Sequence, residues 1–173
     1  MTDICSELKE SKEQLKKIAG SQQGNAANPH YSVWVEASAG TGKTKVLSDR
    51  VLRLLLNGVN PAKILCLTYT KAAAVEMNTR ISERLGKWAV ISDKELNLEL
   101  ENLLGKVEDD NKFAELAARA RTLFATMLDV AGGMKIQTIH SFCQEILKRF
   151  PLEAGISPYF SVMDDSMAKE ALD

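Results

Sequence analysis

The segment ASAGTGKT, residues 37–44, limits more than any other what this chain can fold into. It follows the run SVWVE (32–36), whose β-branched and aromatic residues predict a strand, and it precedes a helical stretch that ends near Asn57. The segment has the pattern GxxxxGK[ST], with Ala37 in the place of the first glycine. A turn of small residues between a strand and a helix is the setting in which this pattern forms a phosphate-binding loop. The plain alternative is a turn that joins two elements and binds nothing.

The residue types of this loop fit the phosphates of a nucleotide. Small residues allow the backbone to curl so that successive N–H groups face one anion, and the start of the following helix adds a partly positive end. Lys43 is expected to reach the β- and γ-phosphates and the Thr44 hydroxyl to bind Mg²⁺, which makes these two the predicted catalytic residues. The predicted nucleotide-binding residues of the loop are Ala37, Ser38, Ala39, Gly40, Thr41, Gly42, Lys43 and Thr44. The loop by itself leaves ATPases, GTPases and small kinases as alternatives.

The elements after the loop predict a parallel α/β sheet. The continuous apolar run ILCLT (64–68) is typical of a buried parallel strand, and residues 71–88 carry apolar side chains at helical spacing. KIQTI (135–139) predicts a third strand. Residues 141–150 predict a helix whose inward face consists of Phe142, Ile146 and Phe150. Strands that alternate with helices in this order indicate a parallel sheet.

Two polar regions complete the predicted organisation. Residues 92–130 contain no strand signal and predict two helices, the first beginning at a capping box of Ser92 and Glu95 and the second at Asp109 or Asp110. Before the loop, Lys9 to Ile18 predict a short helix.

The residues between that short helix and the loop are turn-rich. SQQGNAANP (21–29) predicts an entry segment made of turns. In the helix after the loop, Lys45, Asp49 and Arg53 are expected largely on the polar side.

Composition and charge exclude several classes of protein. With 45% hydrophobic and 26% charged residues, the chain has ordinary globular composition. Three cysteines, none in a CxxC pair, argue against a disulfide scaffold or a zinc knuckle. No apolar run approaches the roughly 18 residues of a membrane span, and the first residues lack the apolar core of a secretory signal. We therefore expect a cytoplasmic protein without membrane contact.

Charge is unevenly distributed along the chain. Residues 1–91 carry 13 Lys and Arg against 8 Asp and Glu, whereas residues 92–115 carry 3 against 8. The basic excess of the first half permits a phosphate-binding face, although solvated helix faces would explain it equally well.

Three stretches in one order carry a family resemblance. WVEASAGTGKT (34–44), ILCLTYTKAAAVEMNTRI (64–81) and KIQTIHSFCQEILKRFPLEAGISPYF (135–160) resemble the phosphate loop, motif Ia and the TxH-containing motif of UvrD-like superfamily 1 DNA helicases. Together with the acidic helical region they look like the N-terminal part of the AddA family, the helicase–nuclease subunits of bacterial double-strand-break repair, in the alphaproteobacterial form. The resemblance covers about residues 22–165.

The resemblance implies a fold and a division of the chain. The fold would be an α/β P-loop NTPase with a RecA-like parallel sheet core, incomplete, and a helical insertion. Residues 1–91 would be the first part of the ATP-binding lobe, 92–133 the insertion, and 134–173 the third strand, the TxH helix and the start of a helical subdomain. The cofactors would be ATP and Mg²⁺. The partners would be single-stranded DNA and an AddB-like subunit or a separately encoded remainder of the enzyme.

The resemblance also implies roles for single residues outside the loop. Gln23, with Gln22 adjacent, best fits the glutamine that reads the adenine, since an amide both donates and accepts hydrogen bonds; a solvated turn glutamine is the alternative. Residues of motif Ia and the TxH histidine would contact single-stranded DNA at the carboxyl ends of two strands: Thr68, Tyr69, Thr70 and His140. A half-buried strand-end aromatic and a structural histidine are the alternatives there.

Hydrolysis and translocation need more than these motifs. They require an acid that holds Mg²⁺, a carboxylate that positions water, and a second lobe, which lie far downstream in the family. FSVMDD (160–165) is a weak candidate for the acid motif. The chain therefore resembles the first portion of a larger enzyme, expected to bind nucleotide weakly and to hydrolyse it little. A non-catalytic binding or docking module and a small P-loop kinase are the competing hypotheses.

Overall fold

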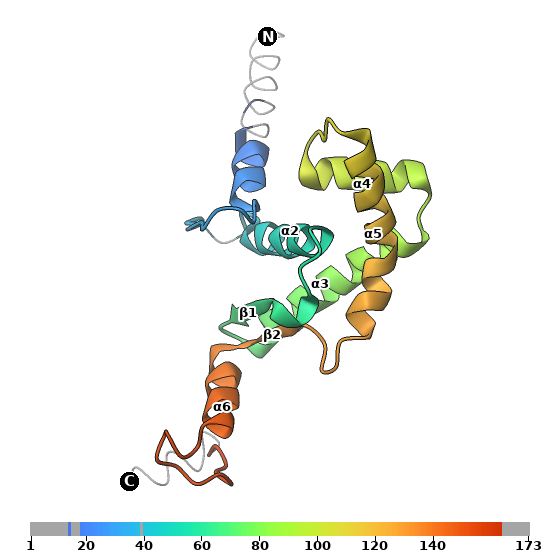
Figure 1. Ribbon diagram of the computed structural model, residues 1–173. Helices are drawn as coiled ribbons and strands as arrows, with labels where there is room; N and C mark the ends of the chain where they lie inside the picture. Colours follow the sequence, from blue (N-terminus) through green and yellow to red (C-terminus); the bar gives the residue numbers. More distant parts are fainter. Residues whose placement is uncertain (1–13, 15–17, 39, 164–173) are drawn as a thin grey trace, which may run out of the picture.

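The computed structural model describes residue 14 and residues 18–38 and 40–163 as a mixed α/β arrangement that is mostly helical (Figure 1). Its named elements are α2 (Lys43–Leu56), the 3-10 helix η1 (Pro61–Lys63), β1 (Leu65–Thr68), α3 (Lys71–Val90), α4 (Asp93–Leu104), α5 (Asp110–Leu128), β2 (Lys135–Thr138) and α6 (Ile139–Arg149). Three of the predictions fall outside the described residues: Ala39 of the loop, most of the helix from Lys9 to Ile18, and Asp164 and Asp165 of the candidate acid motif.

The sheet of the described residues has two parallel strands, which confirms the strands predicted at 64–68 and 135–139. The register pairs Leu65 with Lys135 and Thr68 with Thr138. Because the strands are parallel, they reach the same edge of the sheet together, and the residues that follow each of them are brought close in space. The long crossover between the strands consists of α3, α4 and α5.

One hydrophobic cluster joins the helices to the sheet. Helix α3 packs against both strands and against α2 and α5, and α4 closes the far end (Figure 1). The largest fully buried side chains are Trp88, Leu52, Leu55, Leu56, Met77, Ile81, Leu85, Leu96, Leu100 and Leu103. Met77 and Met127 thus act as packing residues, as their place on the predicted apolar stripes indicates.

Local capping signals correctly locate the starts of α4 and α5. The Ser92 hydroxyl accepts a hydrogen bond from the Glu95 N–H, and the Glu95 carboxylate accepts one from the Ser92 N–H, which is a capping box. Asp109, the first of the two predicted candidates, caps α5 by accepting from the N–H groups of Asn111 and Lys112.

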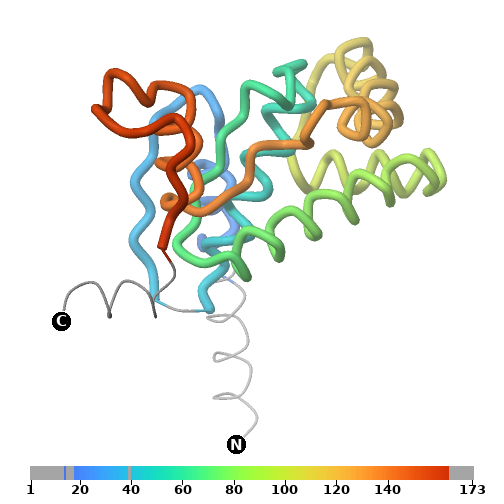
Figure 2. The backbone as a smooth tube through the Cα atoms, turned by 90° about the horizontal axis from the view of Figure 1, so that it is seen from below, coloured from blue at the N-terminus to red at the C-terminus, as the bar shows by residue number. Residues whose placement is uncertain are grey.

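The strand predicted at 32–36 is wrong. Residues 32–38 run without regular secondary structure, and Val33, Trp34 and Val35 are all exposed, Trp34 by 91%. Figure 2 shows this segment at the side of the molecule away from α4 and α5. A β-branched run forms a strand only where a neighbouring strand accepts its backbone hydrogen bonds, and neither β1 nor β2 lies beside it.

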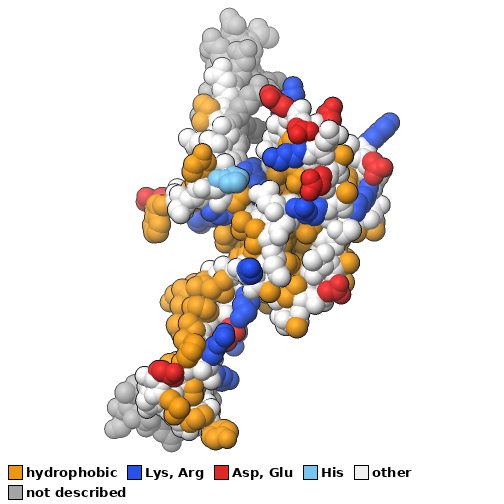
Figure 3. Space-filling view, viewed as in Figure 1, with side chains coloured by type: hydrophobic (Ala, Val, Ile, Leu, Met, Phe, Trp, Pro, Cys, Tyr) orange, Lys and Arg blue, Asp and Glu red, His pale blue; other side chains and the backbone are white. Residues whose placement is uncertain are grey.

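The inward face predicted for the last helix is also wrong. Helix α6 forms close to the predicted place, but none of its residues is buried. Phe142 is half-buried, and Ile146 and Phe150 are exposed. Apolar side chains consequently lie open along this helix (Figure 3). Helical spacing predicted which residues share a face, but it carries no information about what covers that face.

No helix of the described part of the chain is long and apolar enough to cross a membrane.

The burial of Cys66 gives a direct test of the packing of β1. Burial raises the pKa of the Cys66 thiol to about 11, so the thiol stays protonated at pH 8, whereas Cys143 on α6 is exposed. We expect iodoacetamide at pH 8 to alkylate Cys143 in the native protein and to leave Cys66 unmodified until urea is added. Peptide mass spectrometry measures both sites in one sample, with Cys143 as the internal control. Equal alkylation of the two thiols without denaturant would contradict the fold.

Candidate functional site

The turn before α2 has the geometry of an anion site. Gly40 and Gly42 both lie in the left-handed region, with φ of 79° and 95°, where a side chain would be strained. Gly42 is the N-cap of α2 and offers no side chain to the first backbone N–H groups of the helix. These N–H groups lack carbonyl partners within the helix and, with the helix dipole, favour a bound anion.

Lys43 lies folded over this turn. Its Nζ donates hydrogen bonds to the carbonyl oxygens of Ala37 and Ser38, the latter at 2.8 Å. Thr41 Oγ1 donates to the same Ser38 carbonyl at 2.7 Å. The ammonium group is therefore held at the mouth of the loop by weak neutral acceptors, which a phosphate would replace with a charged one. Thr44, the second residue of α2, is exposed.

Gln23 contacts the loop directly. Its Nε2 donates to the Thr41 carbonyl at 3.3 Å, and a Cβ on Gly42 would lie 3.2 Å from the same nitrogen. Gln23 also lines a cavity of about 230 Å³ together with Ala37, Thr41 and Lys43. The adjacent Gln22 is exposed and lines the same cavity.

The turn-rich segment predicted at 21–29 is helical as far as residue 26, so that prediction is wrong. Its backbone is fixed from outside by two arginines of α2. Arg53 donates to the Gly24 carbonyl at 2.8 Å, and Arg50 donates to the carbonyls of Asn28 and Tyr31, each at 2.7 Å. These tertiary hydrogen bonds, which local turn propensity does not report, decide the conformation.

The arginines are functional candidates that the sequence analysis missed. Arg53 also donates to the Leu103 carbonyl at 3.0 Å, so it is partly buried instead of lying on a solvated face, and burial lowers its pKa. No signal in the sequence marks them, since their acceptors are main-chain carbonyls of residues distant in the chain.

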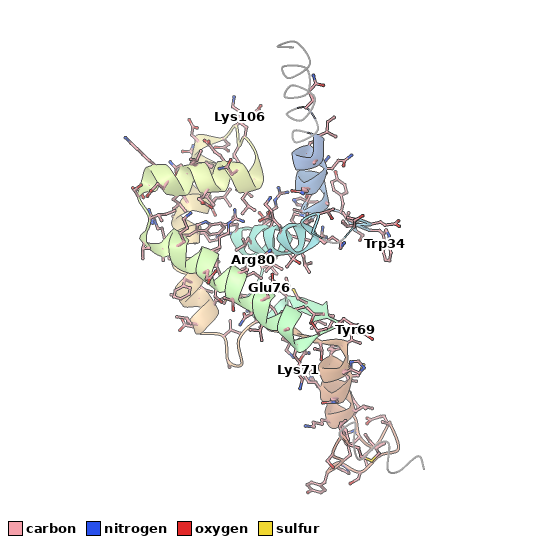
Figure 4. All side chains as sticks on the ribbon, turned by 180° about the vertical axis from the view of Figure 1, so that it is seen from behind. Trp34, Tyr69, Lys71, Glu76, Arg80 and Lys106 are labelled. Carbon is pink, nitrogen blue, oxygen red and sulfur yellow. The ribbon has the colours of Figure 1, made fainter. Side chains whose placement is uncertain are left out.

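An ionic network connects α2 with α3 and α4. Asp49 is only 9% exposed and pairs with Arg84 of α3 at 2.6 Å. Arg84 is 3.6 Å from Glu99 of α4, which accepts a hydrogen bond from Lys87 at 2.7 Å. That hydrogen bond holds the pKa of Glu99 below its usual value. Figure 4 shows α2 crossing α3 near these residues. The helix that follows the phosphate-binding turn is thus tied to both neighbouring helices.

The predicted DNA-contacting residues meet at the carboxyl edge of the sheet, with unequal freedom. Tyr69 follows β1, is 82% exposed and points away from the body of the protein (Figure 4). Thr68 Oγ1 donates to the carbonyls of Thr70 and Gln137, at 3.0 and 3.4 Å. The Thr70 hydroxyl accepts from the Ala73 N–H and caps α3. Both threonines therefore have structural roles, and Tyr69 is the free side chain of the three.

His140 lies in the first turn of α6, directly after β2, and is exposed. Thr138, paired with Thr68 across the sheet, caps this helix by accepting from the Ser141 N–H at 3.1 Å. The register thus brings Tyr69 and His140 to neighbouring strand ends. No group of three or more His, Cys, Asp or Glu suited to a metal ion occurs in the described part of the chain.

Comparison with known proteins identifies the family. Residues 19–173 match the UvrD/REP helicase N-terminal domain. The chain belongs to the UvrD/REP helicase family. It is 39% identical over 140 residues to the AddA protein of the ATP-dependent helicase/nuclease of Lactobacillus gasseri, covering 81% of this chain and 10% of that protein. It is 36% identical over 152 residues to the protein of the same name from Lactobacillus johnsonii, covering 87% and 10%.

These matches confirm the resemblance to UvrD-like helicases and to the AddA group. Another relative of the same name, from Clostridium kluyveri, is 32% identical over 156 residues, 88% of this chain and 10% of that protein. The chain therefore spans about a tenth of the length of the curated relatives it matches. The alphaproteobacterial form stays a prediction, since these relatives come from lactobacilli and a clostridium.

The division of labour between Tyr69 and Thr70 can be tested by stability alone. We expect Thr70→Ala to lower the free energy of unfolding by about 1 kcal/mol, because α3 loses its N-cap. Thr70→Ser should keep most of the stability, and Tyr69→Ala should leave it unchanged because the ring is exposed. Urea denaturation followed by circular dichroism measures all three. A Tyr69→Ala loss as large as that of Thr70→Ala would show that the ring packs against the protein.

Proposed function

We propose that this chain is the ATP-binding lobe of an AddA-like, ATP-dependent DNA helicase of double-strand-break repair. The observation that carries the proposal is the turn before α2, where unpartnered backbone N–H groups, the Lys43 ammonium and the Gln23 amide meet. A triphosphate on the turn and a base against Gln23 would use all three. The underlying core would be the RecA-like P-loop fold, with 92–133 as an insertion between 1–91 and 134–173.

The loop residues also fit a magnesium ion that arrives with the nucleotide. Mg²⁺ takes one or two protein oxygens and fills its remaining positions with phosphate oxygens and water. Thr44 offers an exposed hydroxyl one residue after Lys43, at the mouth of the turn. The ion would supply neutralisation of the charge that develops on the phosphates. Lys43 would orient the β- and γ-phosphates, and the main-chain N–H groups would hold them in place.

Single-stranded DNA is the proposed second ligand. The exposed ring of Tyr69 can stack on any base without reading sequence, and His140 on the neighbouring strand end can donate to a phosphate. Thr68 and Thr70 would contribute main-chain and hydroxyl contacts in addition to their structural hydrogen bonds.

The two proposed ligands are mechanically linked through α2 and α3. Helix α3 begins at Lys71, directly after Tyr69 and Thr70, and the pairing of Arg84 with Asp49 fastens it to the helix that starts at the phosphate turn. A shift of α2 on nucleotide binding would therefore be transmitted to the strand end that carries Tyr69.

The complete activity needs elements that these residues do not supply. The acid motif, the water-positioning carboxylate and the second lobe belong to the part of the enzyme that corresponds to the rest of the relatives' length. We therefore propose that this chain alone binds ATP weakly and turns it over slowly, and that it acts in the cytoplasm. It would act together with an AddB-like subunit or the remainder of the enzyme.

Two alternatives make different predictions. A non-catalytic DNA-binding or docking module would retain DNA regardless of the state of Lys43. A small P-loop kinase would transfer a phosphoryl group to a nucleotide or metabolite. The family match favours the helicase over the kinase.

The nucleotide proposal is tested by replacing the lysine of the turn. We expect Lys43→Ala to abolish calorimetrically measured binding of Mg-ATP, because the charge at the mouth of the loop is lost. Lys63→Ala, in η1, is the matched control, since Lys63 is exposed and lies in a different element. Equal binding by the Lys43→Ala variant and the unchanged protein would contradict the proposed site.

The DNA proposal is tested at Tyr69. Loss of one base–aromatic stack costs roughly 1–3 kcal/mol, so we expect Tyr69→Ala to weaken binding of oligo-dT about tenfold or more, and Tyr69→Phe to weaken it little. Tyr159→Ala is the control, because that ring is 95% exposed and lies outside the strand-end edge. Fluorescence anisotropy measures the affinities. A decrease of the same size in the Tyr159 variant would assign the effect to general stickiness of exposed rings.

A further inference from the structure

Arg53 occupies the middle of a chain of contacts that begins at the phosphate turn and ends at α4. Its guanidinium donates to the Gly24 carbonyl at 2.8 Å and to the Leu103 carbonyl at 3.0 Å. Gly24 directly follows Gln23, whose amide contacts Thr41 of the turn. A single side chain therefore fixes the residue next to the proposed base-reading glutamine and the last turn of a helix about 80 positions later.

We propose that Arg53 is a positioning residue for base selectivity, and that it couples the C-terminal end of α4 to the nucleotide site. The proposal rests on the nucleotide site proposed above and goes beyond it. Arg53 does not touch the nucleotide; it sets the position of the Gln23 amide.

The weakness of the direct contact between Gln23 and the turn makes this external support necessary. The hydrogen bond from Gln23 to Thr41 is long, at 3.3 Å, and Gln23 is only half-buried. The position of the amide must therefore come from its own backbone, which Arg53 holds at Gly24 and Arg50 holds further on, at Asn28 and Tyr31. Without Arg53, the anchor nearest to the amide is lost.

Amide position matters more for the base than for the phosphates. Adenine presents an acceptor at N7 beside a donor at N6, which a glutamine amide matches with one donated and one accepted hydrogen bond. Guanine presents two acceptors at the same edge, so the amide oxygen meets no donor. Directional hydrogen bonds of this kind weaken steeply when the amide moves, whereas the attraction between Lys43 and a triphosphate does not.

The contact with Leu103 brings α4 into the same unit. The last carbonyls of a helix have no partner within it, and the Leu103 carbonyl is satisfied by Arg53. Helix α4 ends at Leu104, with Gly105 as its C-cap. Fixing Gln23 through a bound base is therefore expected to steady this helix end as well.

The test compares Arg53→Lys with Arg121→Lys. Lysine keeps the positive charge but lacks the planar fork that bonds two carbonyls at once. Arg121 is a matched control, because it also joins segments of the chain, through the carbonyls of Trp88 and Ile91 and the carboxylate of Asp93, in a different part of the protein. Calorimetry with Mg-ATP, Mg-GTP and inorganic triphosphate, on the full 173-residue chain, gives the preference for adenine and the phosphate affinity separately.

We expect Arg53→Lys to lower the ATP-over-GTP preference about tenfold, with little change in the affinity for triphosphate. Arg121→Lys should leave the preference unchanged. In a Gln23→Ala background, Arg53→Lys should lower the preference no further, because the two side chains act through one contact. An Arg53→Lys variant that binds nucleotide with the original preference would overturn the inference while the nucleotide site stands. A Lys43→Ala variant that binds triphosphate normally would overturn the nucleotide site and the inference with it.

Hydrogen exchange on the unchanged protein tests the coupling without any variant. We expect Mg-ATP to slow amide exchange both in residues 18–31 and at the end of α4, around 101–105, and inorganic triphosphate to slow neither as much. Protection of residues 18–31 without any at the end of α4 would disprove the link between α4 and the nucleotide site.

Discussion

The first backbone N–H groups of α2 lack partners within the helix, and the rest of the structure depends on how they are held. The two left-handed glycines that precede them make the turn tight enough for these groups to converge. The other end of the helix is immobilised, since Leu52, Leu55 and Leu56 are fully buried in the core. A converging set of donors on a rigid helix is preorganised for an anion, so little reorganisation opposes binding.

Charged side chains of α2 extend that rigidity to its neighbours. Asp49 joins α3 through Arg84, and Arg50 and Arg53 hold the segment that carries Gln23. One helix thereby places the phosphate turn, the glutamine and the helix that leaves the strand end of β1. This shared support explains why a two-stranded sheet suffices to bring the proposed nucleotide and DNA contacts into one molecule of this size.

The sequence predicted the elements whose causes are local. The capping box at Ser92 and the glycine-rich turn before Lys43 depend on residues a few positions apart, and both form as expected. The strands β1 and β2 were predictable because each is a short apolar run that pairs with the other. The run at 32–36 looks the same locally but has no neighbouring strand among the described elements. Arg50 and Arg53 were missed for the same kind of reason, because their acceptors are carbonyls that only the tertiary fold brings near.

The central claim is that the turn around Gly40 and Gly42 holds the phosphates of a nucleotide. Nuclear magnetic resonance of the chain with ¹⁵N-labelled glycine measures this at the atoms concerned. The account predicts that Mg-ATP shifts the amide signals of Gly40 and Gly42 strongly and leaves that of Gly155, in the segment after α6, changed little by comparison. Unchanged signals from Gly40 and Gly42 at millimolar Mg-ATP would contradict the account.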